Sequence, residues 1–139
     1  MIDKNIVTYI KGLNTAAASR VHTGNIPQGS TLPAIVINRL PGTTPRTTNN
    51  TPLASRTPFT IGVVANEFSA AMPVAVQLRG AFDGFHGTMP HDVAELTDPT
   101  DTQVFSARCT SEPTYFDEID GDKTLRAISQ DFFFVHSEI

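Results

Sequence analysis

The residues of this sequence that could do metal or redox chemistry are four histidines and one cysteine. His86 and His91 stand five positions apart, a spacing that places them on different sides of a helix, and Gly87 and Pro90 interrupt the segment between them. No third ligand follows at a spacing typical of zinc sites. Cys109 is the single cysteine, so neither an internal disulfide nor a multi-cysteine metal cluster can form. We therefore expect no metal and no cofactor.

The acidic segment Asp117–Asp122 resembles a calcium-binding loop in composition only. If Gly121 took the sixth position of such a loop, Phe116 would stand at position one and Ala127 at position twelve. Both of those positions need oxygen ligands, so the match fails. The pair Asp120-Gly121 is instead a strong hairpin-turn signal, and we interpret the segment as the acidic tip of a β-hairpin.

The motifs of nucleophilic and phosphate-handling enzymes are missing from the sequence. It has no Gly-x-Ser-x-Gly elbow, and Gly80, Gly84 and Gly87 lack the spacing and the lysine of a phosphate-binding loop. Cys109 lies in an alternating segment, where a buried thiol packs without reacting. The sequence has no stripe of basic residues interleaved with aromatic residues, which argues against recognition of DNA or RNA. The sequence therefore predicts a protein without catalysis.

Charge is divided unevenly along the chain, whose net charge is −4. Residues 1–91 hold seven basic and three acidic residues, a balance of +4, whereas residues 92–139 hold three basic and eleven acidic residues, a balance of −8. Two oppositely charged halves suit head-to-tail contact between copies or with neighbours. The alternative is that the acidic residues only keep solvent-exposed loops hydrated and contact no partner.

The length and composition predict one folded domain. Of the 139 residues, 40% are hydrophobic and 17% are charged, which excludes a charge-dominated disordered chain. No apolar run approaches the roughly 18 residues of a membrane span. Residues 1–13 carry charges and a helical period instead of a signal peptide. We expect residues 1–139 to form a single domain, made in the cytoplasm and without a membrane segment.

Two helices are expected from apolar residues at three- and four-residue steps. The first is capped by Asp3 and runs to about Ala17, and the second runs from a cap at Ser69 to Phe85, with Pro73 tolerated only in its first turn. Their apolar stripes are Ile2, Ile6, Ile10, Leu13 and Ala17, and Ala71, Ala75, Leu78, Phe82 and Phe85.

Five strands are expected from β-branched or alternating runs. Their ranges are Val21–Thr23, Ala34–Leu40, Phe59–Ala65, Gln103–Glu112 and Lys123–His136. The resulting fold class is α+β, with a mostly antiparallel sheet of four to five strands, two helices packed on one face and the order α-β-β-β-α-β-β.

Two segments between these elements are expected to be loops. Residues 41–58 hold four prolines, six threonines, Arg46 and Arg56 but no acidic residue, so a regular central strand is not expected there. This Thr/Pro-rich segment is either a partner-binding arm or a mobile excursion. Residues 88–103 form an acidic loop.

Three consecutive aromatic residues, Phe132 to Phe134, place large rings on both faces of the last strand. One face packs under the helices, and the other exposes Phe132 and Phe134 unless something covers them. We expect either a subunit interface there or a cover made by the first helix and residues 41–58.

Together these segments resemble the tail-terminator and head–tail joining proteins of long-tailed bacteriophages. Residues 25–36 read NIPQGSTLPAIV, and in that family a similar turn, Pro-x-Gly-x-x-x-Pro, enters the first long strand. The strand FTIGVVA at residues 59–65 and the helix at residues 69–85 follow in the same succession. The family closes with a charged hairpin and an aromatic strand, as in residues 117–135. The likeness covers nearly the whole chain.

The resemblance implies a structural protein of the virion neck, assembled in the host cytoplasm. Copies would form a ring, usually of six, that caps the tail tube, joins it to the head connector or stopper and lets genomic DNA pass. An acidic channel wall would not bind the phosphates of the passing DNA, because it offers them no cations. Other neck positions, such as a head-completion or stopper protein, and a small bacterial binding module are alternatives. The candidate lumen or interface residues are Asp92, Glu95, Asp98, Asp101, Asp117, Glu118, Asp120, Asp122, Arg46, Arg56, Phe132 and Phe134.

Overall fold

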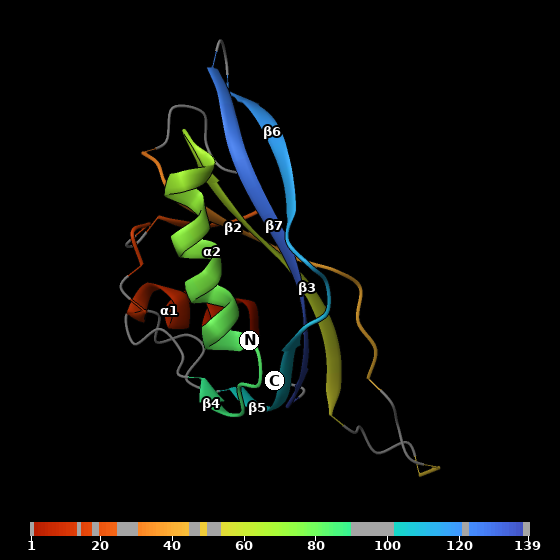
Figure 1. Cartoon of the computed structure of the whole chain (residues 1–139). Coiled ribbons are helices and arrows are strands. Elements are labelled where there is room, and N and C mark those ends of the chain that lie inside the picture. Colours follow the sequence, from red (N-terminus) through yellow and green to blue (C-terminus); the bar gives the residue numbers. More distant parts are fainter. Residues whose placement is uncertain are drawn as a thin grey trace.

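A computed structural model describes residues 2–13, 15–17, 20–24, 31–44, 48–49, 54–89, 102–120 and 123–137. Within these ranges the chain forms two helices and one seven-stranded sheet (Figure 1). In chain order the elements are α1 Ile2–Gly12, β1 Val21–Thr23, β2 Ala34–Arg39, β3 Ser55–Ala65, α2 Phe68–Phe82, β4 Gly87–Met89, β5 Thr102–Cys109, β6 Thr114–Asp120 and β7 Lys123–His136.

The sheet is mixed and is organised around β7. The strand order is β1-β2-β3-β7-β5-β4, and β6 also pairs with β7. One side of β7 pairs with β3, while the other pairs with β6 near the start of β7 and with β5 near its end. The pair β1–β2 is parallel, and the other pairs are antiparallel. The expected α+β class is confirmed, whereas the expectation of four to five strands in the order α-β-β-β-α-β-β missed β4 and β6.

The core lies between the sheet and the two helices. Three isoleucines spaced four residues apart on α1, Ile2, Ile6 and Ile10, are at most 2% exposed. Five side chains of α2 join them against one face of the sheet, namely Ala71, Val74, Ala75, Leu78 and Phe82. The apolar stripes predicted for the helices therefore mark the faces that they bury.

Several element boundaries differ from the expectations. Strand β2 ends at Arg39, and β5 spans Thr102–Cys109. The expected acidic loop of residues 88–103 begins within β4 and ends within β5, and residues 90–101 lie outside the described residues. Helix α1 ends at Gly12 and includes Asp3 in its first turn, although Ala17 is still buried. Helix α2 begins after Glu67 and places Pro73 beyond its first turn, on an exposed side. Strand β3 begins at Ser55 and passes through Pro58.

Pro58 is tolerated in β3 because the strand still contacts a neighbour on each side, Leu40 on one and β7 on the other. Its carbonyl accepts a hydrogen bond from the N–H of Leu40 (3.0 Å), and the residue stands in register with Phe133 of β7. Proline removes only its own donor, so the pairing of β3 with β7 continues on both sides of it. Residues 55–58 therefore belong to the sheet, and the predicted loop is shorter at this end.

Candidate functional site

The two faces of the sheet differ in what covers them. Because side chains alternate along a strand, Phe132 and Phe134 lie on the face packed under the helices, and Phe133 and Val135 lie on the other, which we call the open face. Phe132 and Phe134 are both fully buried. Each ring centroid lies 5.7 Å from that of Phe82 in α2.

This placement corrects the expectation that Phe132 and Phe134 form a candidate interface. Helix α2 covers both rings, and the ring of Phe134 also meets that of Phe59 at a centroid distance of 5.5 Å. Neither side chain is available to a second protein. The phenylalanine that faces outward in this triplet is Phe133, which is only partly buried.

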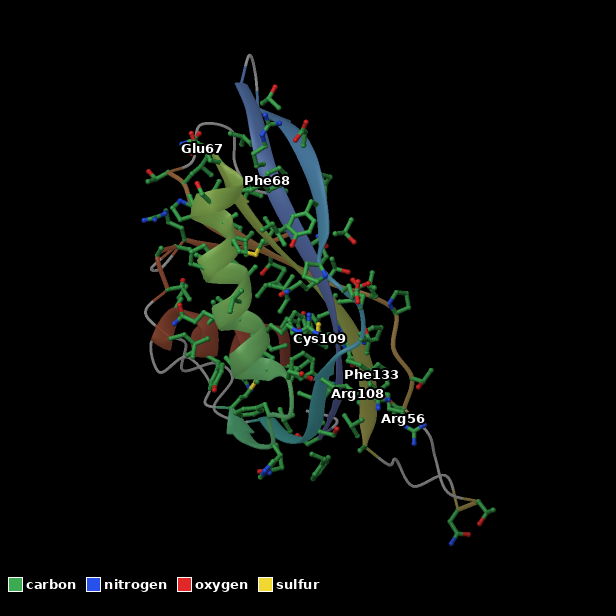
Figure 2. All side chains as sticks on the ribbon, viewed as in Figure 1. Arg56, Glu67, Phe68, Arg108, Cys109 and Phe133 are labelled. Atoms are coloured by element: carbon green, nitrogen blue, oxygen red, sulfur yellow. The ribbon has the colours of Figure 1, made fainter. Side chains whose placement is uncertain are left out.

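Two arginines flank Phe133 on the open face, where Figure 2 shows the three side chains gathered at one end of the sheet. Arg108 of β5 stands directly opposite Phe133, and Arg56 of β3 stands opposite Val135. Both arginines are exposed, and neither makes an ion pair within the described part of the chain. We call Arg56, Arg108 and Phe133 the basic patch.

One acidic side chain lies near the basic patch on the open face. Asp131 precedes Phe133 by two positions, and its carboxylate accepts a hydrogen bond from the hydroxyl of Thr60 (2.9 Å). The backbone of Asp131 is also held, since its N–H donates to the hydroxyl of Ser111 (3.1 Å). At this end of β3, β5 and β7, two arginines stand against one carboxylate, so the described part of these strands carries a net positive charge.

The remainder of the open face is partly closed by the chain itself. Val64, Leu125 and Ala127 form a small buried cluster at the other end of the sheet, and Leu32 packs against it. Val64, Leu125 and Ala127 are no more than 4% exposed, and Leu32 is partly buried. The basic patch therefore lies at the end of the open face that this cover does not reach.

The β6–β7 hairpin forms the opposite end of the molecule and extends past the first turn of α2 (Figure 1). Asp117 of β6 makes an ion pair with Arg126 of β7, directly opposite it in register. The guanidinium of Arg126 lies 5.9 Å from the ring centroid of Phe68, and that ring meets Tyr115 edge to face at 5.7 Å. We call these four residues the hairpin cluster.

Aromatic surface is exposed on both faces of this hairpin. Tyr115 is 51% exposed, and Phe116, which points to the opposite face of the sheet, is 41% exposed. A single exposed apolar residue is common on protein surfaces. Neighbouring exposed rings rimmed by polar residues are more typical of a contact surface. The hairpin thus combines negative charge with apolar area.

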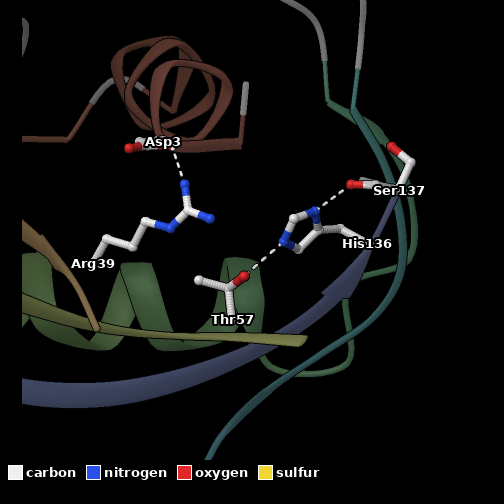
Figure 3. A network of polar contacts seen from close by, with 5 residues as sticks. All are labelled: Asp3, Arg39, Thr57, His136 and Ser137. Carbon is white, nitrogen blue, oxygen red and sulfur yellow. Dashed lines mark hydrogen bonds and ion pairs between the residues drawn. The ribbon is translucent and has the colours of Figure 1, made fainter. Parts of the chain in front are cut away.

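A polar network closes the other end of β7 on its buried face (Figure 3). Nε2 of His136 lies 2.9 Å from the hydroxyl of Thr57, and its Nδ1 meets the carbonyl of Ser137. Burial lowers the pKa of His136 below its ordinary value. Asp3 of α1 pairs nearby with Arg39 of β2 at 3.2 Å. These contacts fasten strand ends and the first helix, and among the described residues no three His, Cys, Asp or Glu side chains gather to hold a metal ion.

The acidic candidates are only partly within the described residues. The structure places Asp117 in the hairpin cluster and Arg56 in the basic patch. Glu118 and Asp120 belong to β6, which pairs with β7. The remaining candidates lie outside the described residues, namely Asp92, Glu95, Asp98, Asp101, Asp122 and Arg46.

Sequence reasoning missed Arg108 and Phe133 as surface residues. The available signal was the alternation within residues 103–112, where Arg108 lies between Ala107 and Cys109. What the sequence could not show is that β5 and β3 both pair with β7, which brings Arg108 and Arg56 to one surface. No helix in the described part of the chain is long and apolar enough to cross a membrane.

Comparison with known proteins shows a likeness to solved structures. No protein-family model matches the sequence, and no curated protein matches it. Among solved structures, the chain is similar to one described as the virion of a native gene transfer agent particle. The two share 13% sequence identity with a TM-score of 0.53, over 96% of this chain and 94% of that chain. The likeness is one of fold, and it extends over nearly the whole length of both chains.

Proposed function

We propose that this protein is a structural component of a phage-like virion and acts as a tail terminator or head–tail joining protein. Copies form a closed ring, of six in the resembling family, which caps the tail tube and connects it to the head connector or stopper. Genomic DNA passes through the ring without specific binding. The protein would reside in the neck of the virion and would act by its shape and its contacts.

The observation that carries this proposal is the likeness in fold to a chain from a virion particle, which covers nearly all of both chains. A partial likeness could reflect one common supersecondary unit, whereas this one includes the helices and the sheet together. The resemblance of the sequence to tail-terminator proteins supports the finer assignment to the neck.

The arrangement of surfaces supports a ring. A closed ring with rotational symmetry needs two unlike surfaces on every copy, so that each copy binds the next in the same way. The basic patch and the β6–β7 hairpin are unlike in charge and lie at opposite ends of the sheet (Figure 1, Figure 2). These surfaces could each meet a neighbour.

Electron microscopy of the purified protein mixed with purified tail tubes tests the proposal. We expect closed rings at one end of each tube, and tubes that no longer lengthen when free tube protein is added. Light scattering should give the mass of a closed ring, in solution or after release from tubes. A protein that binds connectors but not tubes would occupy another neck position, and one that remains monomeric with both would contradict the proposal.

A further inference from the structure

We infer that the basic patch is the docking surface for the acidic β6–β7 hairpin of a second copy of this chain. This inference rests on the proposed function, because it names the contact by which neighbouring copies would associate. On the side of the basic patch it concerns Arg56 and Arg108, which make no ion pair within the described part of the chain.

The basic patch has the chemistry of a surface that receives carboxylates. Arg56 and Arg108 belong to strands on either side of β7, Arg108 opposite Phe133 and Arg56 opposite Val135, and Figure 2 shows the three labelled residues close together. Directly opposed residues on neighbouring strands have Cβ atoms about 5 Å apart, so Arg108 and Phe133 form one continuous surface. A guanidinium presents several N–H donors in a plane and binds a carboxylate through two of them.

The hairpin has the complementary chemistry. The β6–β7 hairpin, residues 114–130, holds four acidic residues against two basic ones, Lys123 and Arg126, and is acidic on balance. Residues 4–66, which include Arg56, hold six basic residues and no acidic one. Tyr115 and Phe116 add exposed rings to the same strand. Charges would direct the approach, and the rings would supply apolar area against Phe133 and Pro58.

The hairpin of one copy cannot reach its own basic patch. Along β7, Arg126 of the hairpin cluster stands nine positions from Val135, which is opposite Arg56. At about 3.3 Å per residue, this separation is about 30 Å along a rigid sheet. The contact must therefore join different copies, and because the two surfaces are unlike, each copy can bind one neighbour at each end.

Charge reversal tests this contact in the full-length protein. The patch variant carries Arg56→Glu and Arg108→Glu, and the hairpin variant carries Glu118→Arg and Asp120→Arg. A control variant, Lys11→Glu with Arg79→Glu, makes the same change in charge as the patch variant at two exposed helical positions outside both surfaces. Sedimentation equilibrium measures the self-association of each, and circular dichroism confirms that each is folded.

We expect the patch and hairpin variants each to associate at least about tenfold more weakly than the wild type, since opposed charges become like charges. An equal mixture of the two variants should regain association, because each contact then joins opposite charges again. The chain carrying all four reversals should also associate with itself. The control variant should match the wild type, and added salt should weaken wild-type association.

The results separate this inference from the proposed function. Rings of the patch variant that form as readily as wild-type rings would overturn the docking contact and leave the proposed function standing. Failure of the mixture to regain association would also overturn it, because the patch would then serve another partner. A wild type that does not self-associate contradicts the contact, and a wild type that forms no ring even with tail tubes contradicts the proposed function as well.

Discussion

The hydroxyl of Thr57, near the start of β3, lies 2.9 Å from Nε2 of His136, at the end of β7 (Figure 3). The other ring nitrogen of His136 faces the carbonyl of Ser137, which can only accept a hydrogen bond. The arrangement therefore fits a neutral ring that donates from Nδ1 and accepts at Nε2. His136 is 1% exposed, so this polar pairing is buried at the end of the sheet.

We predict that acid destabilises the protein partly through His136. Burial lowers its pKa in the folded state below the ordinary value of 6.5, so the unfolded chain takes up a proton first as the pH falls. The contribution of His136 is thus constant above about pH 6.5 and is lost as the pH falls towards the lowered pKa of the folded state. Urea unfolding at pH values from 8 to 5, about the range in which histidines titrate, would measure this slope.

The matched variants for this measurement are His136→Asn and His86→Asn. The first lacks the titrating ring, so its unfolding free energy should depend less on pH in this range, even though its stability is lower throughout. The second changes an exposed histidine and should keep the wild-type slope. Equal slopes in all three proteins would show that other groups control the acid response.

We also predict that Phe82 is the most costly aromatic side chain to remove from the helices. Its ring contacts the rings of Tyr9, Phe132 and Phe134 at centroid distances of 5.5 to 5.7 Å, and it is fully buried. Phe82→Ala should lower the free energy of unfolding by about 3–5 kcal/mol, because it leaves a cavity where α2 meets the sheet. Thermal or urea unfolding would measure the loss.

The matched control for Phe82 is Phe105, which is 54% exposed at a bulge in β5. Phe105→Ala should change the free energy of unfolding by no more than about 0.5 kcal/mol. A comparable loss in both variants would mean that Phe105 is covered in solution, for example by a second copy, and the concentration dependence of unfolding would reveal it.

The buried core was predictable because it depends on local periodicity. The four-residue spacing of Ile2, Ile6 and Ile10 predicted the buried face of α1, and β7 has the bounds expected for the last strand. Strand β6 was missed because its sequence, TYFDEID, does not alternate. Tyr115 and Phe116 point to opposite faces and both stay exposed, so β6 depends on backbone pairing with β7.

The basic patch was not predictable because its residues meet only through the order of strands. The parallel pairing of β1 with β2 and the position of β7 between β3 and β5 are set by packing over the whole chain. A local pattern can give the face on which Arg108 lies, but it cannot give the neighbouring strand. Acidic residues at the hairpin could be located because the turn signal is local.

We predict unequal effects of removing the two partners of the hairpin ion pair. The side chains of Asp117 and Arg126 are 57% and 39% exposed, so Asp117→Asn should cost less than about 1 kcal/mol of unfolding free energy. Arg126→Ala should cost more, because Arg126 also covers the ring of Phe68. Urea unfolding at low and high salt would separate the two contributions, since salt should reduce only the ion-pair part. Equal losses in both variants would exclude a role for the ring contact.

The last prediction concerns Gly42, which follows β2 and lies against β3. A Cβ atom there would stand 2.3 Å from the carbonyl oxygen of Arg56 and 3.1 Å from the Cα of Thr57, both of which are backbone atoms that cannot rotate away. Gly42→Ala should therefore push residues 40–44 off β3 and cost about 1–3 kcal/mol of unfolding free energy. It should also weaken self-association, because Arg56 of the basic patch would lose both of its backbone hydrogen bonds to Thr43.

Gly80 provides the control for this substitution. It lies on an exposed part of α2 with nothing within 4 Å of an added Cβ, so Gly80→Ala should raise the free energy of unfolding by up to about 1 kcal/mol through helix propensity. The two variants add the same methyl group and should shift stability in opposite directions. If Gly42→Ala lowers stability without weakening self-association, the basic patch does not need residues 40–44 against β3 to keep Arg56 in place.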